Sequence, residues 1–303
     1  MGFLDSVKGV FSKKKDDGVP KKANVLLDVS SNYRLDRHAF TGTMSKFHVA
    51  TEIGSNVKKG IKLLDKEKTA FFKARFKGLK KPPEGAIGLK IVHPRVVETY
   101  QYGRTMQGQE YILMEYIHGP GVNTLCKQRD TTMNGNRLKL LRQMAEAIQA
   151  VHDAGFIHRD VCPRNFICNE DFEWLKLIDF GLTIPNEAPY RLPGNRTGTP
   201  QYMAPEIVRR RETDERVDIF AFGVTCYKVL TLEHPWRSTD TTGKTALTHD
   251  SMDPDDIRKH RPNLNPKLAD AVMKCLNPDP NKRYPSCKHF LAKIREVNQE
   301  DAQ

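Results

Sequence analysis

Residues 158–165 read HRDVCPRN, and the interpretation of the whole chain begins from this stretch. Asp160 and Asn165 are five positions apart, so one short segment carries both a carboxylate and a side-chain amide. Cys162 and Arg164 lie between them. Asp and Asn also favour turns and caps, so each residue alone fits a purely structural role. The stretch therefore needs support from the rest of the sequence before it indicates chemistry.

Three further motifs follow this stretch along the chain. They are IDFG at 178–181, GTPQYMAPE at 198–206 and DIFAFG at 218–223. Any one of them alone is weak, but their order and spacing together resemble the signature set of the eukaryotic-like (Hanks-type) protein kinases. HDAGFIHRD at 152–160 is similar in wording to bacterial serine/threonine members of that family. The resemblance covers residues 33–297, nearly all of the folded chain.

The apolar pattern divides the chain into a strand-rich first part and a helix-rich second part. Strand-like runs come first, at 47–50, 59–64 and 111–118. Helical patterns follow, at 137–155, 217–231 and 267–276. The change falls at the Gly-Pro-Gly of 119–121, which predicts two unequal lobes joined near that point.

The family resemblance implies the same organisation, an α+β bilobal fold. We expect a small β-rich N-lobe over residues 33–117 and a larger helical C-lobe over residues 118–297. Residues 1–32 are predicted to be a basic amphipathic tail and linker, and residues 298–303 a C-terminal tail.

The resemblance also implies that the chain binds ATP together with Mg²⁺, or with Mn²⁺ in its place. Asp179 of the IDFG motif would hold the cation that bridges the phosphates, and Asn165 would provide a second metal position. Carboxylate and amide oxygens suit such hard cations. Asp160 would orient the substrate hydroxyl for in-line attack and accept its proton.

A lysine and a glutamate upstream are assigned by the same resemblance. KKGIKLLD at 58–65 resembles the third strand of the family, which makes Lys62 the residue that contacts the α- and β-phosphates. HPRVV at 93–97 is similar to the segment after the family's regulatory helix, and counting back nine residues leads to Glu84. Glu84 is the only acidic residue in the range 69–97, so we expect it to pair with Lys62.

The glycine-rich loop is the part that departs most from the family. TGTMSKFHVA keeps only Gly42 of the usual three glycines, and Met44 and Phe47 fill the other two places. Side chains there should weaken the backbone cradle for phosphate, so we expect looser ATP binding. The remaining adenine contacts implied by the family are a roof, a floor, a gatekeeper and two backbone positions, namely Val49, Ile167, Met114, Glu115 and Ile117.

HRDVCPRN differs from the usual serine/threonine pattern at Cys162, where most members carry a lysine that contacts the γ-phosphate. Tyrosine kinases commonly lack that lysine and carry an arginine four places after the aspartate, where this chain has Arg164. A guanidinium can supply the missing charge with two donors. We therefore interpret Arg164 as a relocated phosphate contact.

The segment GTPQYMAPE is typical of serine/threonine kinases, so the expected partner is a protein substrate with a Ser or Thr acceptor. Thr199 would contact Asp160. The usual position of activating phosphorylation falls on Asn195, which leaves Thr197 as the nearest candidate. Constitutive activity and control by dimerisation stay open.

Four further residues are assigned structural roles by the resemblance. Glu206 and Arg283 would form a buried ion pair that fastens the activation segment to the C-lobe. Asp218 would hold the backbone of the catalytic loop, and His158 would pack within that loop.

Composition narrows the class of protein without naming a partner. The 303 residues are 38% hydrophobic, which fits a globular protein with a sizeable core. The six cysteines form no CxxC pair, which predicts a reducing, cytoplasmic setting. The net charge of +12 selects no partner by itself, and with these motifs we expect no nucleic acid. MGFLDSVKGVFSKKK at 1–15 predicts either a peripheral contact with an anionic membrane or a frayed or docking tail.

The sequence leaves three functions to compare. An active serine/threonine protein kinase is the leading interpretation. A pseudokinase or scaffold of the same fold is the second, because the glycine loop is incomplete and Cys162 replaces a lysine. A small-molecule phosphotransferase is the third, and the peptide-docking segment at 198–206 argues against it.

Overall fold

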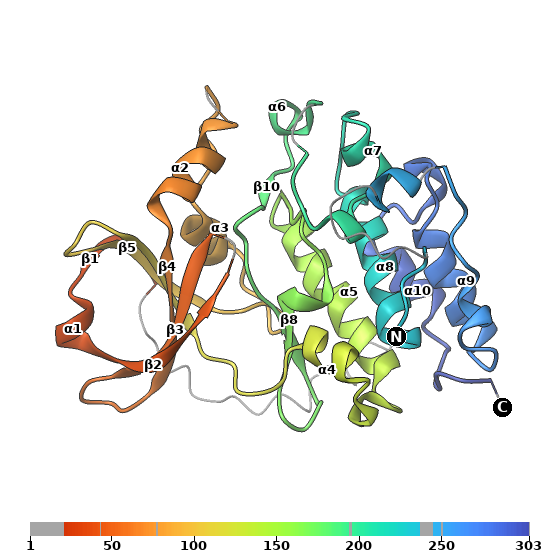
Figure 1. Cartoon of the computed structure of the whole chain (residues 1–303), viewed down its shortest axis with the longest axis horizontal. Coiled ribbons are helices and arrows are strands. Elements are labelled where there is room, and N and C mark those ends of the chain that lie inside the picture. Colours follow the sequence, from red (N-terminus) through yellow and green to blue (C-terminus); the bar gives the residue numbers. More distant parts are fainter. Residues whose placement is uncertain are drawn as a thin grey trace, which may run out of the picture.

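The protein has two lobes, one built on a β-sheet and one mainly helical (Figure 1). The structure is a computed structural model that describes residues 21–42, 44–76, 78–193, 196–236, 245–249 and 251–302. The predicted α+β bilobal architecture is confirmed. The segment 1–15 lies outside the described residues, so its membrane interpretation stays a prediction.

The N-lobe is a six-stranded sheet with the order β1-β5-β6-β4-β3-β2. Its strands are β1 Lys22–Leu27, β2 Tyr33–Thr41, β3 Ser45–Glu52, β4 Lys58–Leu64, β5 Thr99–Thr105 and β6 Glu110–Glu115. Neighbouring strands are antiparallel except β1, which runs parallel to β5. The predicted strands at 47–50, 59–64 and 111–118 correspond to β3, β4 and β6.

Alternate side chains of this sheet point to two different environments. One face carries a small cluster of its own, made of Leu27, Tyr33, Ala50, Ile61, Tyr111 and Leu113. The other face belongs to the main hydrophobic cluster, which continues into the C-lobe and includes Leu64, Ile112 and Met114. This second face therefore looks into the space between the lobes.

Three helices complete the N-lobe: α1 Val29–Asn32, α2 Lys66–Ala74 and α3 Glu84–Lys90. The short helix α3 lies unusually close to β5. A Cβ atom on Gly85 would lie 2.3 Å from Cβ of Tyr102, and one on Gly88 would lie 2.3 Å from Oγ1 of Thr99. Only glycine permits this approach, and it fixes where Glu84, the first residue of α3, is held.

The C-lobe is built around the long helices α5 Arg137–Asp153 and α8 Arg216–Thr231. The other helices are α4 Val122–Gln128, α6 Ala188–Arg191, α7 Pro205–Val208, α9 Pro266–Cys275 and α10 Cys287–Lys293. Its short strands are β7 Phe156–Ile157, β8 Phe166–Cys168, β9 Leu175–Leu177 and β10 Ile184–Pro185. Helix α8 is buried along almost its whole length, as its apolar sequence predicts.

Backbone hydrogen bonds and a ring contact are among the interactions that join the two lobes. The N–H of Val97 donates to the carbonyl of Leu177 over 2.9 Å, and the N–H of Leu177 donates to the carbonyl of Arg95 over 2.8 Å. Farther up, the ring of Phe76, just after α2, lies 6.1 Å from the ring of Tyr190 in α6. Figure 1 shows α2 and α6 at the upper edge of the view, α2 in the N-lobe and α6 in the C-lobe.

The predicted boundary of the N-lobe at residue 33 is wrong, because β1 adds residues 22–27 to the edge of the sheet. The reason lies in Gly103 on β5. A Cβ atom there would lie 1.9 Å from the carbonyl oxygen of Val25, so this glycine is what allows β1 to pair. A parallel partner so far away along the chain leaves no local signal in the sequence.

The prediction that residues 298–303 form a tail is also wrong for most of that segment. Glu300 is only 7% exposed, and its carboxylate accepts the N–H of Arg137 over 2.6 Å at the start of α5. It also pairs with Arg261 over 2.7 Å, and Asp301 forms a β-bridge with Leu264. A charged residue near the end of the chain is expected in a solvated tail, yet Glu300 caps a helix.

Among the described residues, no helix is long and apolar enough to cross a membrane.

Candidate active site

Lys62 lies at the centre of a buried ionic cluster on β4. Its Nζ donates to Oε1 of Glu84 over 2.5 Å and to Oδ1 of Asp179 over 2.8 Å. Glu84 comes from the start of α3, and Asp179 lies beyond β9, 117 positions away in the sequence from Lys62. The predicted Lys62–Glu84 pair is therefore present, and Asp179 joins it from the other lobe.

Lys62 and Asp179 each stabilise the charged form of the other. Burial lowers the pKa of Lys62, but the charges of Asp179 and Glu84 outweigh it and raise that pKa above its ordinary value. Burial raises the pKa of Asp179, but Lys62 outweighs it and brings that pKa to about 2. Asp179 is therefore ionised at neutral pH, and 45% of its side chain remains exposed. Such a carboxylate can bind a divalent cation.

The catalytic-loop residues are connected to each other. Nδ2 of Asn165 donates to the carbonyl oxygen of Asp160 over 2.7 Å and to its Oδ2 over 3.1 Å. The amide nitrogen of Asn165 is thus engaged with Asp160, so its amide oxygen is the atom suited to a cation. Oxygen ligands from Asn165 and Asp179 fit a hard ion such as Mg²⁺ that keeps several of its waters.

Backbone pairing brings the HRD and DFG segments together. The N–H of Ile178, just before Asp179, donates to the carbonyl of Asn165 over 2.8 Å. Strands β8 and β9 pair immediately beyond these residues. The ring of His158 lies 5.8 Å from that of Phe180 in an edge-to-face contact. Asp160, Asn165 and Asp179 therefore lie around one small region, as the sequence predicts.

Asp218 forms hydrogen bonds with the backbone of the catalytic loop, as predicted. This fully buried carboxylate at the start of α8 accepts the N–H groups of His158 over 2.7 Å and of Arg159 over 2.8 Å. Nε2 of His152 lies 2.8 Å from it as a third partner. Arg159 has φ of 66° and Asp179 has φ of 70°, a conformation that costs energy outside glycine. The hydrogen bonds to Asp218 help to hold this strained loop.

Thr199 connects the activation segment to Asp160. Its hydroxyl donates to Oδ1 of Asp160 over 2.6 Å, and a nitrogen of Arg164 donates to the same hydroxyl over 2.6 Å. Cys162 is fully buried, and Sγ lies 3.9 Å from the Thr199 hydroxyl. Burial, together with the charge of Asp160, raises the pKa of Cys162 to about 11. The thiol stays protonated at neutral pH and makes a poor nucleophile.

The residues predicted to surround the adenine come from both lobes. Val49 on β3 is opposite Gly60 on β4, and Gly60 is in turn opposite Met114 on β6. From the C-lobe, Ile167 of β8 forms a β-bridge with Gly121 at the start of α4. Ile117 is buried, and the Glu115 carboxylate pairs with Lys176 over 2.5 Å.

Gly42 and Met44 of the glycine-rich loop lie between β2 and β3. The N–H of Gly42 donates to the carbonyl of Ser45 over 2.8 Å. Met44 reaches inward, and its Cε would lie 3.2 Å from a Cβ on Gly181 of the IDFG motif. The methionine thus lies against the segment that carries Asp179, where a second loop glycine would leave open space.

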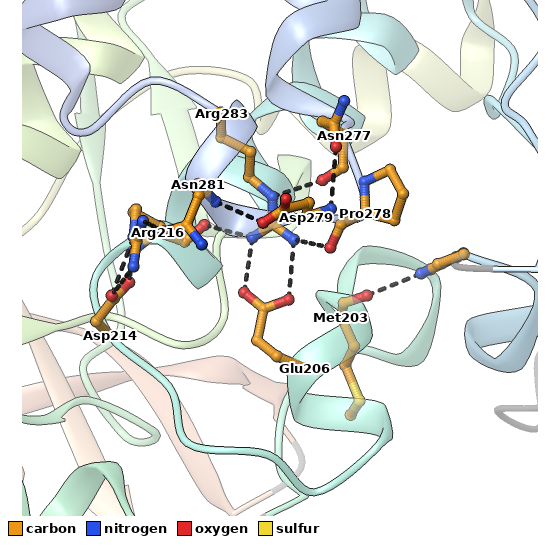
Figure 2. Close-up of polar contacts among 10 residues, drawn as sticks. Met203, Glu206, Asp214, Arg216, Asn277, Pro278, Asp279, Asn281 and Arg283 are labelled. Atoms are coloured by element: carbon orange, nitrogen blue, oxygen red, sulfur yellow. Dashed lines mark hydrogen bonds and ion pairs between the residues drawn. The ribbon is translucent and has the colours of Figure 1, made fainter.

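Glu206 and Arg283 form the predicted buried ion pair. Two nitrogens of Arg283 donate to the two carboxylate oxygens of Glu206 over 2.7 and 2.8 Å, as Figure 2 shows. The guanidinium also donates to the carbonyl oxygens of Arg216, Asn277 and Pro278. Arg283 is 3% exposed and Glu206 is 5% exposed, so this saturated pair fixes α7 to the lower C-lobe.

Comparison with known families gives the same result over almost the entire folded chain. The family model described as "Protein kinase domain" matches residues 33–294. The chain belongs to the protein kinase family.

Several bacterial kinases are similar in sequence. The chain is 26% identical to serine/threonine-protein kinase pkn3 of Myxococcus xanthus over 90% of its own length and 51% of that protein. It is 27% identical to PknA of Mycobacterium tuberculosis over 89% of its length and 62% of the relative. With PknD of Chlamydia felis the figures are 29%, 70% and 26%. The chain thus spans about a quarter to three fifths of these relatives.

The activation segment does not offer an exposed acceptor at Thr197. Thr197 is only 6% exposed, so a second enzyme would reach its hydroxyl only if the segment opened. Asn195, the usual acceptor position, lies outside the described residues. Phosphorylation of Thr197 stays a prediction.

Sequence reasoning missed several residues that position the kinase site. Gly85 and Gly88 set the place of α3, Gly60 lies in the cleft wall, and His152 is the third partner of Asp218. The spacing of the two glycines in EGAIGLK was the one available signal, since glycines four or three apart share a helix face. His152 precedes the motif by several residues, and Gly60 appeared to be an ordinary strand residue.

Proposed function

We propose that this protein kinase transfers the γ-phosphoryl group of Mg-ATP to Ser or Thr hydroxyls of a protein substrate. The observation that carries the proposal is the joined set of contacts from Glu84 through Lys62 to Asp179, and from Thr199 through Asp160 to Asn165. Phosphoryl transfer depends on positioning and on charge stabilisation more than on covalent help from the protein. A pre-assembled set of this kind supplies both.

Each residue has a separate task in this proposal. Lys62 neutralises phosphate charge, and Glu84 fixes the direction of its ammonium group. Asp179 and Asn165 would hold the cations that ATP brings, with Mg²⁺ as the expected ion and Mn²⁺ as an alternative. Asp160 orients the acceptor hydroxyl and takes its proton, which lies within the usual role of a carboxylate base.

Serine/threonine specificity is supported by Thr199. Its hydroxyl bonds Asp160 from a GTPQYMAPE segment, the form typical of serine/threonine kinases. The names of pkn3, PknA and PknD describe serine/threonine-protein kinases. We also propose that Arg164 contributes positive charge beside the transferred phosphoryl group, since its guanidinium already lies next to Thr199 and Asp160.

We further propose that the protein works in a reducing compartment such as the cytoplasm. All six cysteines are buried free thiols, and none is held in a disulfide. This state agrees with a compartment that keeps thiols reduced.

The test is transfer of label from γ-labelled ATP to a generic Ser/Thr substrate protein in the presence of Mg²⁺ or Mn²⁺. Asp160→Asn should abolish the transfer, whereas the matched change Asp171→Asn at an exposed loop position should leave it intact. Thermal stabilisation by Mg-ATP without any transfer would instead support the pseudokinase interpretation. Phosphoamino-acid analysis of the product then distinguishes Ser/Thr from Tyr acceptors.

A further inference from the structure

Phe47 lies on the face of the N-lobe sheet that packs against the main hydrophobic cluster. Side chains alternate along β3, and Ala50 belongs to the cluster on the opposite face. Phe47 and Val49 are therefore on the other face. The register places Phe47 directly opposite Lys62 and Val49 directly opposite Gly60, so the phenylalanine ring shares a wall with the central lysine of the active site.

The ring of Phe47 fills the space above Gly60. A Cβ atom on Gly60 would lie 2.6 Å from both Cε2 and Cζ of Phe47, distances that real Cβ atoms do not tolerate. The same atom would lie 3.2 Å from Cγ of Met114. The ring, the bare backbone of Gly60 and the Met114 side chain thus form one contact layer across β3, β4 and β6. Glycine at position 60 is what admits the ring.

This layer coincides with the space that a purine would need. In the proposed nucleotide site, Val49 covers the base, Met114 lies behind it, and the backbone of Glu115 and Ile117 faces its edge. Gly60 is next to both Val49 and Met114 in the strand register. A purine that lies against these residues must also lie against Gly60, where the Phe47 ring is. The ring and the base cannot occupy that space together.

We propose that Phe47 gates the nucleotide site, and that Gly60 is the residue that lets the gate close. The inference rests on the proposed kinase function. Before Mg-ATP binds, the ring must leave the layer above Gly60. The apparent affinity is then the intrinsic affinity reduced by the fraction of molecules whose ring is already out. Phe47 and Gly60 thereby determine how much nucleotide the kinase needs.

The experiment compares the affinity for Mg-ATP by calorimetry, and KM for ATP and kcat by steady-state kinetics, in five full-length proteins: the wild type, three single variants and the Phe47→Ala/Gly60→Ala double variant. Phe47→Ala removes the gate. Gly60→Ala keeps the phenylalanine but places a methyl group where its ring lies. Phe71→Ala is the matched control, because Phe71 lies on α2 away from this layer and is 68% exposed. The wild-type protein is the reference.

We expect Phe47→Ala to lower Kd and KM by about 3- to 10-fold with little change in kcat. This is the increase in apparent affinity when an open state populated at roughly 10–30% becomes the only state. Gly60→Ala should do the same by a different route, and the double variant should add nothing. Phe71→Ala should match the wild type. Thermal unfolding without nucleotide verifies that each variant is folded, and either of the two gate variants alone carries the test.

The opposite result has a distinct signature. Unchanged or weaker Mg-ATP binding by Phe47→Ala and Gly60→Ala, while the wild type binds, would overturn the gate and leave the kinase function standing. Weaker binding in particular would mean that the ring stacks on the base. If Mg-ATP binds to none of the five proteins, the proposed function and the gate are both overturned.

Discussion

Thr199 donates both its backbone N–H and its hydroxyl to one oxygen of the Asp160 carboxylate, over 3.0 and 2.6 Å. The activation segment is thereby attached to the residue proposed as the catalytic base. Any movement of this segment changes the orientation of that carboxylate. The relationship connects the conformation of the activation segment to the chemistry at the centre of the molecule.

Thr199→Ala should lower kcat by about 10- to 100-fold, because a hydrogen bond to a charged group contributes roughly 1.5–3 kcal/mol. The backbone N–H bond survives this change, so the protein should fold normally. Thr199→Ser retains a hydroxyl and should restore most of the activity. Steady-state kinetics measures both variants. An alanine variant with wild-type kcat would show that the contact has no role in turnover.

Arg164→Ala tests whether this guanidinium replaces the lysine absent at position 162. We expect kcat to fall by about 10-fold or more, since one charge-assisted contact near the phosphoryl group is lost. Arg211→Ala, at an exposed position on the surface, is the matched control and should be silent. Undiminished turnover by Arg164→Ala would remove the interpretation of HRDVCPRN as a relocated contact.

Arg283→Met should lower the free energy of unfolding by about 3–5 kcal/mol, because it leaves the Glu206 carboxylate buried without its partner. The contrasting variant is Arg258→Met, which removes the exposed pair with Asp270. That change should cost less than about 1 kcal/mol. Denaturant unfolding followed by fluorescence gives both values. Equal losses in the two variants would contradict this account of the buried pair.

Gly88→Ala should displace α3, since the new Cβ would lie 2.3 Å from Oγ1 of Thr99. Glu84 would move with the helix, and kcat/KM should fall by about 10- to 100-fold, as expected for a misplacement of about 1 Å in an active site. Removing the obstruction with Thr99→Ala in the same chain should recover part of the loss. A double variant no better than Gly88→Ala would argue that the glycine acts in another way.

Stability should fall at alkaline pH, partly because of Cys168. Burial raises the pKa of this thiol from an ordinary 9.0 to about 12. Its contribution is therefore fully present below pH 9 and is lost as the pH rises toward 12, because the unfolded chain releases the proton first. Unfolding curves of the wild type and Cys168→Ala between pH 9 and 11 should diverge in slope by up to about 1.4 kcal/mol per pH unit. Parallel pH dependences would refute the shift.

The sequence predicts the local parts of this site well and the long-range parts poorly. Asp160, Asn165 and Asp179 belong to short motifs whose spacing is itself the signal, and the structure brings them together. The pairing of Lys62 with Glu84 was predicted by counting from a neighbouring segment. These successes concern residues whose roles depend on chemistry that few other residue types can supply.

The missed features depend on contacts between segments far apart in the chain. Gly103 is required only because β1 lies against it, and Gly60 only because the ring of Phe47 does. The sequence around a glycine does not indicate which distant segment packs against it. The same holds for Glu300, whose carboxylate bonds α5 across 163 positions of sequence. Such contacts are decided by packing, which local patterns do not encode.

Glu300 also determines where this protein can be shortened. Helix α5 has no side-chain cap from its own N-cap residue, Asn136, so the carboxylate of Glu300 takes that place for the N–H of Arg137. A negative charge at a helix N-terminus also interacts favourably with the positive end of the helix dipole. Removing the residues after Val297 would leave the N–H of Arg137 without this cap. The first turn of α5 would then be where unfolding of the C-lobe begins.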